Sequence, residues 1–141
     1  MRNTGVFQAP DVDVPEMDAD HQLLCQVCDR LREAIASDAP LGDVEPLLDE
    51  LVRRTQDHFS NEEREMRECG YSHYAWHARQ HRAAADKVIA FERRILNGDR
   101  QAAGELLEFL SGWLDDHIGI ADRMLAAHLR NRRRAAAVRP A

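Results

Sequence analysis

Apolar residues recur at spacings of three and four along four stretches of the chain, the period of an α-helix with one buried face. The first stretch carries the stripe His21, Leu24, Cys28, Leu31 and Ile35. Asp18 stands before this stripe as a candidate N-cap, and the segment from Ser37 to Gly42 interrupts it. We therefore expect a first helix between these two signals.

A second helix is predicted from about Asp43 to Cys69. Its inward stripe is Val44, Leu47, Leu51, Arg54 or Thr55, His58, Glu62 and Met66. Gly70 follows as a C-terminal stop, because glycine readily takes the left-handed conformation that ends a helix.

Ser72 is a candidate cap for a third helix, which Asn97-Gly98 would end. Its stripe is Trp76 or His77, His81, Ala84, Val88, Phe91 and Ile95. A fourth helix is predicted from about Asp99 to Arg134. Its candidate core positions are Leu106, Phe109 or Leu110, Trp113, His117, Ile120, Met124 and Leu125.

The four predicted helices follow one another with short connections, as in an up-down-up-down antiparallel bundle. Residues 1–17 contain prolines and little periodicity, so they are predicted to form an extended N-terminal arm. We therefore predict an all-α four-helix bundle over residues 18–130, preceded by this arm and followed by a basic Ala/Arg-rich tail, 131–141.

Length and composition fit one globular domain, with 44% apolar and 31% charged residues in 141. No apolar run approaches the roughly 18–20 residues that span a membrane, and the first residues lack the apolar core of a secretory signal. The three cysteines do not form a disulfide framework. A reducing cytoplasm is the expected location.

The formal net charge of -6 conceals a cluster of arginines near the C-terminus. They are Arg130, Arg132, Arg133, Arg134 and Arg139. Such a tail can touch nucleic acid or a membrane surface, or it can be a solvated helix end whose cations suit the helix dipole. Because the rest of the chain is acidic, we expect no dedicated nucleic-acid binding.

Two pairs of potential metal ligands occur at the helical spacing of four, His58 with Glu62 and His77 with His81. Residues four apart lie about 40° apart around a helix, so each pair can face one interior point. His73 and His77 share that spacing, but the distance from the Gly-Tyr turn favours His77 with His81.

His117 and Asp122 are five residues apart, an offset of ~140° on a regular helix. They can converge only if Asp122 reaches sideways or the helix widens locally, as in a π-bulge. We therefore predict a local departure from α-helical geometry between them, at a position where Gly119 weakens the helix.

A lone histidine such as His21 is usually a hydrogen-bonded core residue, and one His-Glu pair is usually a surface feature. Together, however, these positions place histidines and carboxylates on the inward stripes of all four helices. The candidate ligands are His21, His58, Glu62, His77, His81, His117 and Asp122. Seven nitrogen and oxygen ligands suit a dinuclear site better than a structural or catalytic zinc site.

The segments MDADHQLL, HFSNEEREMRECGY, HARQH and WLDDHIGIAD resemble the hemerythrin family, particularly its bacterial single-domain members, over about residues 18–125. The resemblance implies two non-haem iron ions bridged by Glu62, Asp122 and an oxo or hydroxo group. By that resemblance, one iron would take three histidines, His77, His81 and His117. The other would take His21 and His58 and keep one position open.

The resemblance implies that dioxygen binds reversibly at the open position, for oxygen storage, delivery or sensing rather than catalysis. Reversible binding needs a dry pocket, for which the candidate wall residues are Leu24, Cys25, Phe59, Trp113 and Ile118. The alternatives are a di-iron enzyme acting on peroxide or nitric oxide and an oxygen-responsive interaction module with an unknown protein partner. Manganese or zinc could occupy the same ligands.

The chain departs from the family pattern in two places. Ser72 follows Gly70-Tyr71 where family members commonly carry proline, and the arm offers Phe7 where they often carry tryptophan. Outside the ligand set, we expect His73 to be exposed and His128 to be a surface or partly buried residue. The CxxC of Cys25 and Cys28 is interpreted as two small core residues, with a redox-active thiol pair as the alternative, and Cys69 is expected to be exposed.

Overall fold

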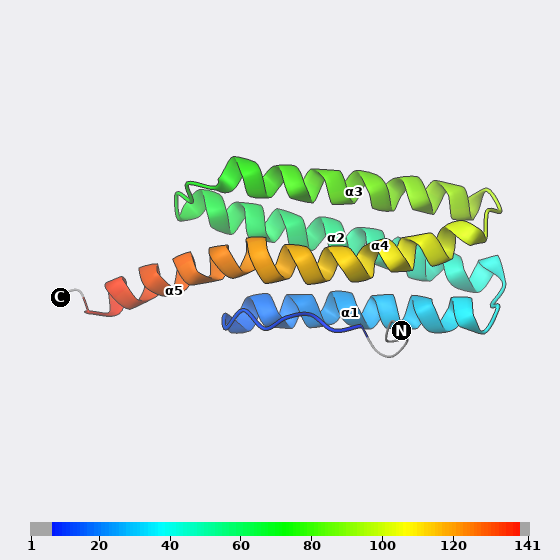
Figure 1. Ribbon diagram of the computed structural model, residues 1–141, viewed down its shortest axis with the longest axis horizontal. Coiled ribbons are helices and arrows are strands. Elements are labelled where there is room, and N and C mark those ends of the chain that lie inside the picture. Colours follow the sequence, from blue (N-terminus) through cyan, green and yellow to red (C-terminus); the bar gives the residue numbers. More distant parts are fainter. Residues whose placement is uncertain (1–6, 139–141) are drawn as a thin grey trace.

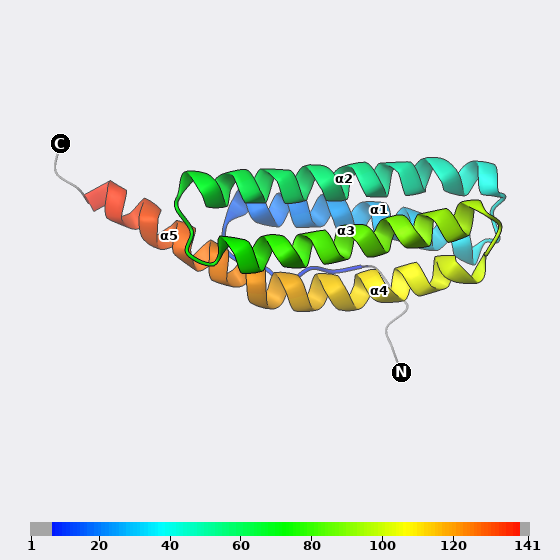
Figure 2. The same cartoon turned by 90° about the horizontal axis from the view of Figure 1, so that it is seen from above.

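Four antiparallel helical rods form the structure, a computed structural model that describes residues 7–138 (Figure 1). The segments are α1 Pro15–Ala36, α2 Leu41–Glu68, α3 Tyr74–Leu96, α4 Gln101–His117, η1 Ile118–Asp122 and α5 Arg123–Val138. The last three form one continuous rod, whose α5 end projects beyond the other helices (Figures 1 and 2). No strand occurs within residues 7–138, which confirms the all-α prediction.

Each helix packs against its neighbours in the sequence, and α1 also packs against α4, so the four rods close into a bundle. The connections between helices are short, as predicted. Fully buried leucines fill the end nearest the α1–α2 and α3–α4 connections: Leu31, Leu48, Leu51 and Leu106. Met66, Leu125 and Val14 are fully buried toward the opposite end. Burying one such side chain contributes roughly 1.5–3 kcal/mol relative to leaving it exposed.

The glycine stops predicted for the second and third helices are confirmed, whereas two of the predicted N-terminal caps are wrong. Gly70 and Gly98 have φ of 62° and 95°, the left-handed conformation that ends α2 and α3. Asp18 does not cap α1, because the helix already begins at Pro15, whose fixed φ suits a first turn. Ser72 likewise does not cap α3, which begins at Tyr74 without a side-chain cap.

Residues 7–14 form an extended arm that runs back along α1 and beside α4 (Figures 1 and 2). The Phe7 backbone N–H donates to Asp29 Oδ1 at 2.6 Å, and its side chain packs against the core. The Val12 N–H donates to Asp18 Oδ1 at 2.9 Å, and the Val12 carbonyl accepts from Arg130 at 2.5 Å. The arm is thus held by α1 and α5. Residues 1–6 and 139–141, including Arg139 of the tail, lie outside the described residues.

Several ambiguous core positions are resolved. Thr55, His77 and Leu110 are the buried members of their alternative pairs. In α2, Leu48 is fully buried and the predicted Leu47 is only half-buried. In the fourth rod, Ile120 is 59% exposed, so that prediction is wrong.

Met124 is also exposed, at 40%, and Ile118 and Ala121 are buried instead. The reason is the wider turn of η1, which changes the face that each residue presents.

Candidate metal centre

All seven predicted ligands lie buried in one layer across the bundle, contributed by every rod. His21 comes from α1, His58 and Glu62 from α2, His77 and His81 from α3, and His117 and Asp122 from α4 and η1. Each is at most 5% exposed. Packing five imidazoles and two carboxylates away from water is costly unless their polar atoms find partners.

The seven side chains divide into two groups that share both carboxylates. One group contains Glu62, His77, His81, His117 and Asp122, and the other contains His21, His58, Glu62 and Asp122. Within each group, one potential ligand atom of every residue lies within 4.8 Å of the others. The two groups have the same histidines as the two iron sites implied by the family resemblance.

The Glu62 carboxylate directs one oxygen to each group. Oε1 lies 3.0 Å from His77 Nε2 and 3.1 Å from His81 Nε2. Oε2 lies 3.1 Å from His58 Nε2. Glu62 therefore has the geometry of a bridging carboxylate.

Asp122 divides its two oxygens in the same way. Oδ1 lies 3.0 Å from His77 Nε2 and 3.1 Å from His117 Nε2. Oδ2 lies 2.9 Å from His21 Nε2. Both carboxylates thus face both histidine groups, as two ions bridged by carboxylates require.

The polar atoms at the centre of the layer lack enough hydrogen-bonding partners. Among the described residues, those with no hydrogen bond include His21 Nε2, Glu62 Oε2, His81 Nε2, His117 Nε2 and both Asp122 carboxylate oxygens. Each unsatisfied buried polar atom costs about 1–3 kcal/mol. Two metal ions would satisfy these nitrogen and oxygen atoms together, so the residues present fit a dinuclear centre.

Three of the five histidines donate their outer Nδ1–H to a side chain on the preceding rod. His58 pairs with Asp20 Oδ2 at 3.2 Å, and His81 pairs with Glu63 Oε2 at 2.8 Å. His117 pairs with Gln80 Oε1 at 2.9 Å. These bonds fix the ring orientation and leave Nε2 pointing toward the centre.

Sequence reasoning missed Asp20, Glu63 and Gln80. The available signal is their position, since each stands directly beside a predicted ligand in the sequence. Each one serves a histidine of the next rod, a relationship that only the packing of the helices shows.

The predicted departure from α-helical geometry lies where the ligand spacing required it. Residues Ile118–Asp122 form a single π-helical turn between α4 and α5. The wider turn lets His117 and Asp122 approach to 3.1 Å although they are five residues apart. The π-bulge prediction is confirmed.

In the metal-free layer, the carboxylates hold protons on two of the imidazoles. Burial lowers the pKa of His58, but the Glu62 charge and a hydrogen bond to Asp20 raise it to about 10. Burial likewise lowers the pKa of His77, but the adjacent carboxylates of Asp122 and Glu62 raise it to about 9. Burial alone would raise the pKa of Glu62, but the nearby histidines hold it well below its usual range.

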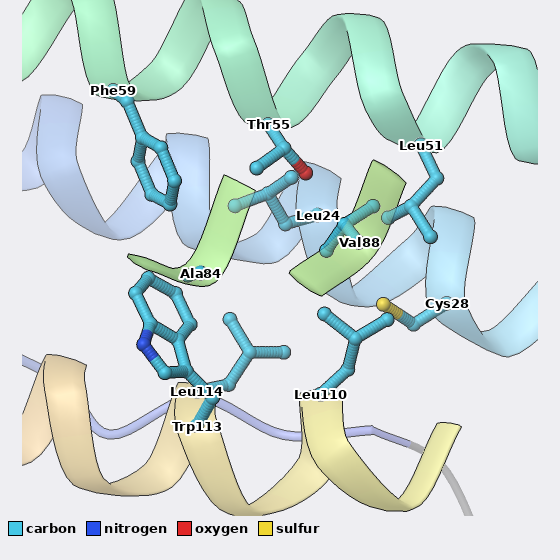
Figure 3. Close-up of a pocket in the computed structure, with 10 residues that line it drawn as sticks. All are labelled: Leu24, Cys28, Leu51, Thr55, Phe59, Ala84, Val88, Leu110, Trp113 and Leu114. Carbon is cyan, nitrogen blue, oxygen red and sulfur yellow. The ribbon is translucent and has the colours of Figure 1, made fainter. Parts of the chain in front are cut away.

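Two aromatic rings lie flat against ligand histidines. Phe59 stacks on His81 with ring centroids 4.0 Å apart, and Trp113 stacks on His117 at 4.4 Å. Both rings border a small cavity inside the bundle (Figure 3).

Leu24 borders the same cavity, which is lined almost entirely by apolar side chains. Three of the five predicted wall residues, Leu24, Phe59 and Trp113, therefore line it. Cys25 and Ile118 are buried but do not belong to this lining.

Other candidate groups lie away from the ligand atoms. His73 is exposed, and His128 is half-buried with its ring 5.1 Å from that of Tyr71. Cys25 and Cys28 are buried free thiols. Burial and the Asp29 charge raise the pKa of Cys25 to about 11, and burial raises the pKa of Cys28, which fits the core-residue interpretation. Cys69, predicted exposed, is only partly so.

Comparison with known proteins agrees with this geometry. Residues 12–129 match the family described as the hemerythrin HHE cation binding domain. The bacteriohemerythrin of Stenotrophomonas maltophilia (strain R551-3) is 32% identical over 125 residues, which cover 84% of this chain and 79% of the relative.

Two further relatives bear the same name. The bacteriohemerythrin of Ralstonia nicotianae is 29% identical over 82% of this chain and 80% of its own. That of Clostridium acetobutylicum is 24% identical over 80% and 91%, respectively. No helix within residues 7–138 has the length and apolar character needed to cross a membrane. The family match over most of the chain and its buried set of histidines and carboxylates show that this protein belongs to the hemerythrin family.

Proposed function

We propose that the chain binds dioxygen reversibly at a di-iron centre held by the seven buried ligands. The observation that carries this proposal is the unequal division of histidines between two groups that share both carboxylates. Two ferrous ions would supply the two electrons that dioxygen accepts on binding. The proposed functional unit is the bundle of residues 18–130, with the arm and the tail attached to it.

The division of histidines makes the two sides chemically different. Three histidines, His77, His81 and His117, and two carboxylate oxygens face one side, while only His21 and His58 and two carboxylate oxygens face the other. An oxo or hydroxo group shared by two bound ions would complete the ligands of the three-histidine side and would leave the two-histidine side one free position. A carrier needs such a position, because the ligand must bind and leave without displacing a protein side chain.

The apolar cavity beside the layer supports reversible binding. Its free volume is about 10 Å³, which is at the lower limit for holding one water molecule. Phe59 and Trp113 lie toward one end of the cavity, with Leu51 and Cys28 toward the other (Figure 3). Apolar walls keep water and protons away from bound dioxygen. Water and protons would otherwise promote irreversible oxidation of the metal.

Anaerobic loading with ferrous iron followed by exposure to oxygen tests the proposal. Two irons per chain and an oxy absorption band that disappears under vacuum and returns with oxygen support it. Immediate conversion to a ferric spectrum, with consumption of peroxide or nitric oxide in later turnovers, would overturn it in favour of an enzyme. The three free thiols favour a reducing location, so we keep the cytoplasm as the proposed compartment.

A further inference from the structure

A cleft of about 220 Å³ between α1, α2 and α5 leads from the surface to the ligand layer. We call it the acidic cleft, and its polar lining includes Glu16, Asp20, Asn61 and Glu65, with His58 and Glu62 at its base. The side chains of Glu16, Asp20 and Glu65 are 55%, 39% and 43% exposed, whereas those of His58 and Glu62 are about 5% exposed. The cleft thus joins solvent to two ligands of the two-histidine side.

The charge of this lining favours cations. Four of the residues that line the cleft carry carboxylates, and one, Arg64, carries a guanidinium. A cleft lined by one sign of charge concentrates oppositely charged ions and accelerates their arrival. The cavity that Phe59 borders is lined almost entirely by apolar side chains and has a free volume of about 10 Å³, so it has no room for a hydrated ion.

An unpartnered ligand atom lies at the base of the cleft. Glu62 is 5% exposed, and its Oε2 makes no hydrogen bond. Asp20, which also lines the cleft, lies 3.2 Å from His58 through its Oδ2. Carboxylates therefore extend from the exposed mouth to an atom that needs a cation.

Arg133 on α5 competes for the carboxylates at the mouth. Its guanidinium forms an ion pair with Glu16 and lies 3.4 Å from Glu65 Oε1. An incoming ion needs the same oxygen atoms, so this arginine must yield before both can bind the ion.

We propose that the acidic cleft is the route by which divalent metal cations reach the centre, and that Arg133 restricts it. The proposal rests on the metal centre of the proposed function but not on what the loaded centre does with dioxygen. It assigns a kinetic role to residues that are not ligands.

Stopped-flow uptake of Co²⁺ by the metal-free full-length chain, followed by its visible absorption, tests the route. Glu65→Gln should slow uptake and Arg133→Gln should accelerate it, each by about threefold or more at low ionic strength, given the size of steering effects. Added salt should reduce both differences by screening. The matched controls Asp43→Asn and Arg134→Gln remove the same charges at exposed positions outside the cleft and should load at the wild-type rate.

The cobalt content and spectrum at the end of uptake distinguish a variant with a slower or faster route from one with a damaged metal centre. Each variant should finish with the wild-type cobalt stoichiometry and spectrum, because none of the altered residues is a ligand. Equal uptake rates in Glu65→Gln, Arg133→Gln and the two controls would overturn the route while leaving the metal centre intact. Cobalt uptake with the expected rate differences in a protein that fails to bind dioxygen would support the route and overturn only the proposed function.

Discussion

Nδ1 of His81 on α3 lies 2.8 Å from Oε2 of Glu63 on α2, and Glu63 directly follows the bridging ligand Glu62. A single pair of neighbouring residues therefore supplies one ligand and orients another on the next helix. Gln80 and Asp20 repeat the arrangement for His117 and His58. The same contacts therefore join successive helices and orient three of the ligand histidines.

Replacing Glu63 by Gln should weaken metal binding without unfolding the bundle. The variant loses the carboxylate charge that orients the His81 ring, and loss of such an outer partner typically costs about 10–100-fold in metal affinity. Competition with a chelator measures the affinity. Glu45→Gln, at an exposed position of the same helix, is the control, and an equal loss of affinity in both variants would contradict the orienting role.

Gly119→Ala should stabilise the metal-free protein. The new Cβ would lie 3.9 Å from Pro10 Cγ, an ordinary van der Waals contact, and alanine favours a helical backbone by up to about 1 kcal/mol. Urea denaturation measures the free energy of unfolding, with Gly112→Ala as a control whose Cβ meets no atom. A clear loss of stability in Gly119→Ala alone would show that the π-helical turn requires glycine.

Metal uptake should release about two protons per chain at pH 8, because a bound imidazole must be neutral. The pKa values of His58 and His77, about 10 and about 9, keep both rings protonated at this pH without metal. Both values are raised, so metal affinity should fall as the pH falls. A pH indicator in weak buffer records the release, and uptake without acidification would refute the protonated state.

The same shifts set the pH dependence of the metal-free fold. Raised histidine pKa values stabilise the folded state fully below pH 6.5, and this contribution is lost as the pH rises toward 10. The lowered pKa of Glu62 contributes stability above its unfolded value of 4.5, which is lost in acid. Thermal melts of the metal-free protein should therefore show highest stability between about pH 4.5 and 6.5.

Two nearly isosteric substitutions in the apolar cavity should change autoxidation in opposite directions. Val88→Thr adds a hydroxyl group that can hold water, and Thr55→Val removes one. If one water is stabilised by about 1 kcal/mol, the oxidation rate should change about fivefold. Decay of the oxy spectrum measures the rate, and Leu23→Asn, at an exposed position of α1, is the control. Equal decay in all three variants would show that water in this cavity does not limit oxidation.

Only one thiol should react rapidly with a disulfide reagent in the folded protein. Burial and the Asp29 charge raise the pKa of Cys25, and burial raises that of Cys28, whereas Cys69 is partly exposed. Thiol counts before and after denaturation should be one and three. A second rapid reaction without denaturant would favour the redox-active interpretation of the CxxC.

The bundle and the converging ligands could be predicted because helical spacing alone places His58 beside Glu62 on one face. The five-residue step from His117 to Asp122 even located the π-helical turn. The predicted N-caps Asp18 and Ser72 are wrong because α1 begins at Pro15 and α3 begins at Tyr74, both without a side-chain cap, so the sequence signal for a cap was not used.

The prediction that Ile120 and Met124 face inward is wrong because a regular α-helical period does not hold through the π-helical turn Ile118–Asp122. The bond from Glu63 to His81 crosses between helices, so no single-helix pattern contains it. Contacts of this kind follow from packing and could not be obtained from spacing within one segment.

The ligand layer has a consequence for how the bundle melts. Its imidazoles and carboxylates cross a single hydrophobic core, which includes Leu31 and Leu106 at one end and Met66 and Leu125 at the other. Without metal, unsatisfied polar atoms of this layer lie inside the core; two bound ions would join side chains of all four rods there. Metal binding should therefore raise the melting temperature of the whole bundle and not only order the ligands.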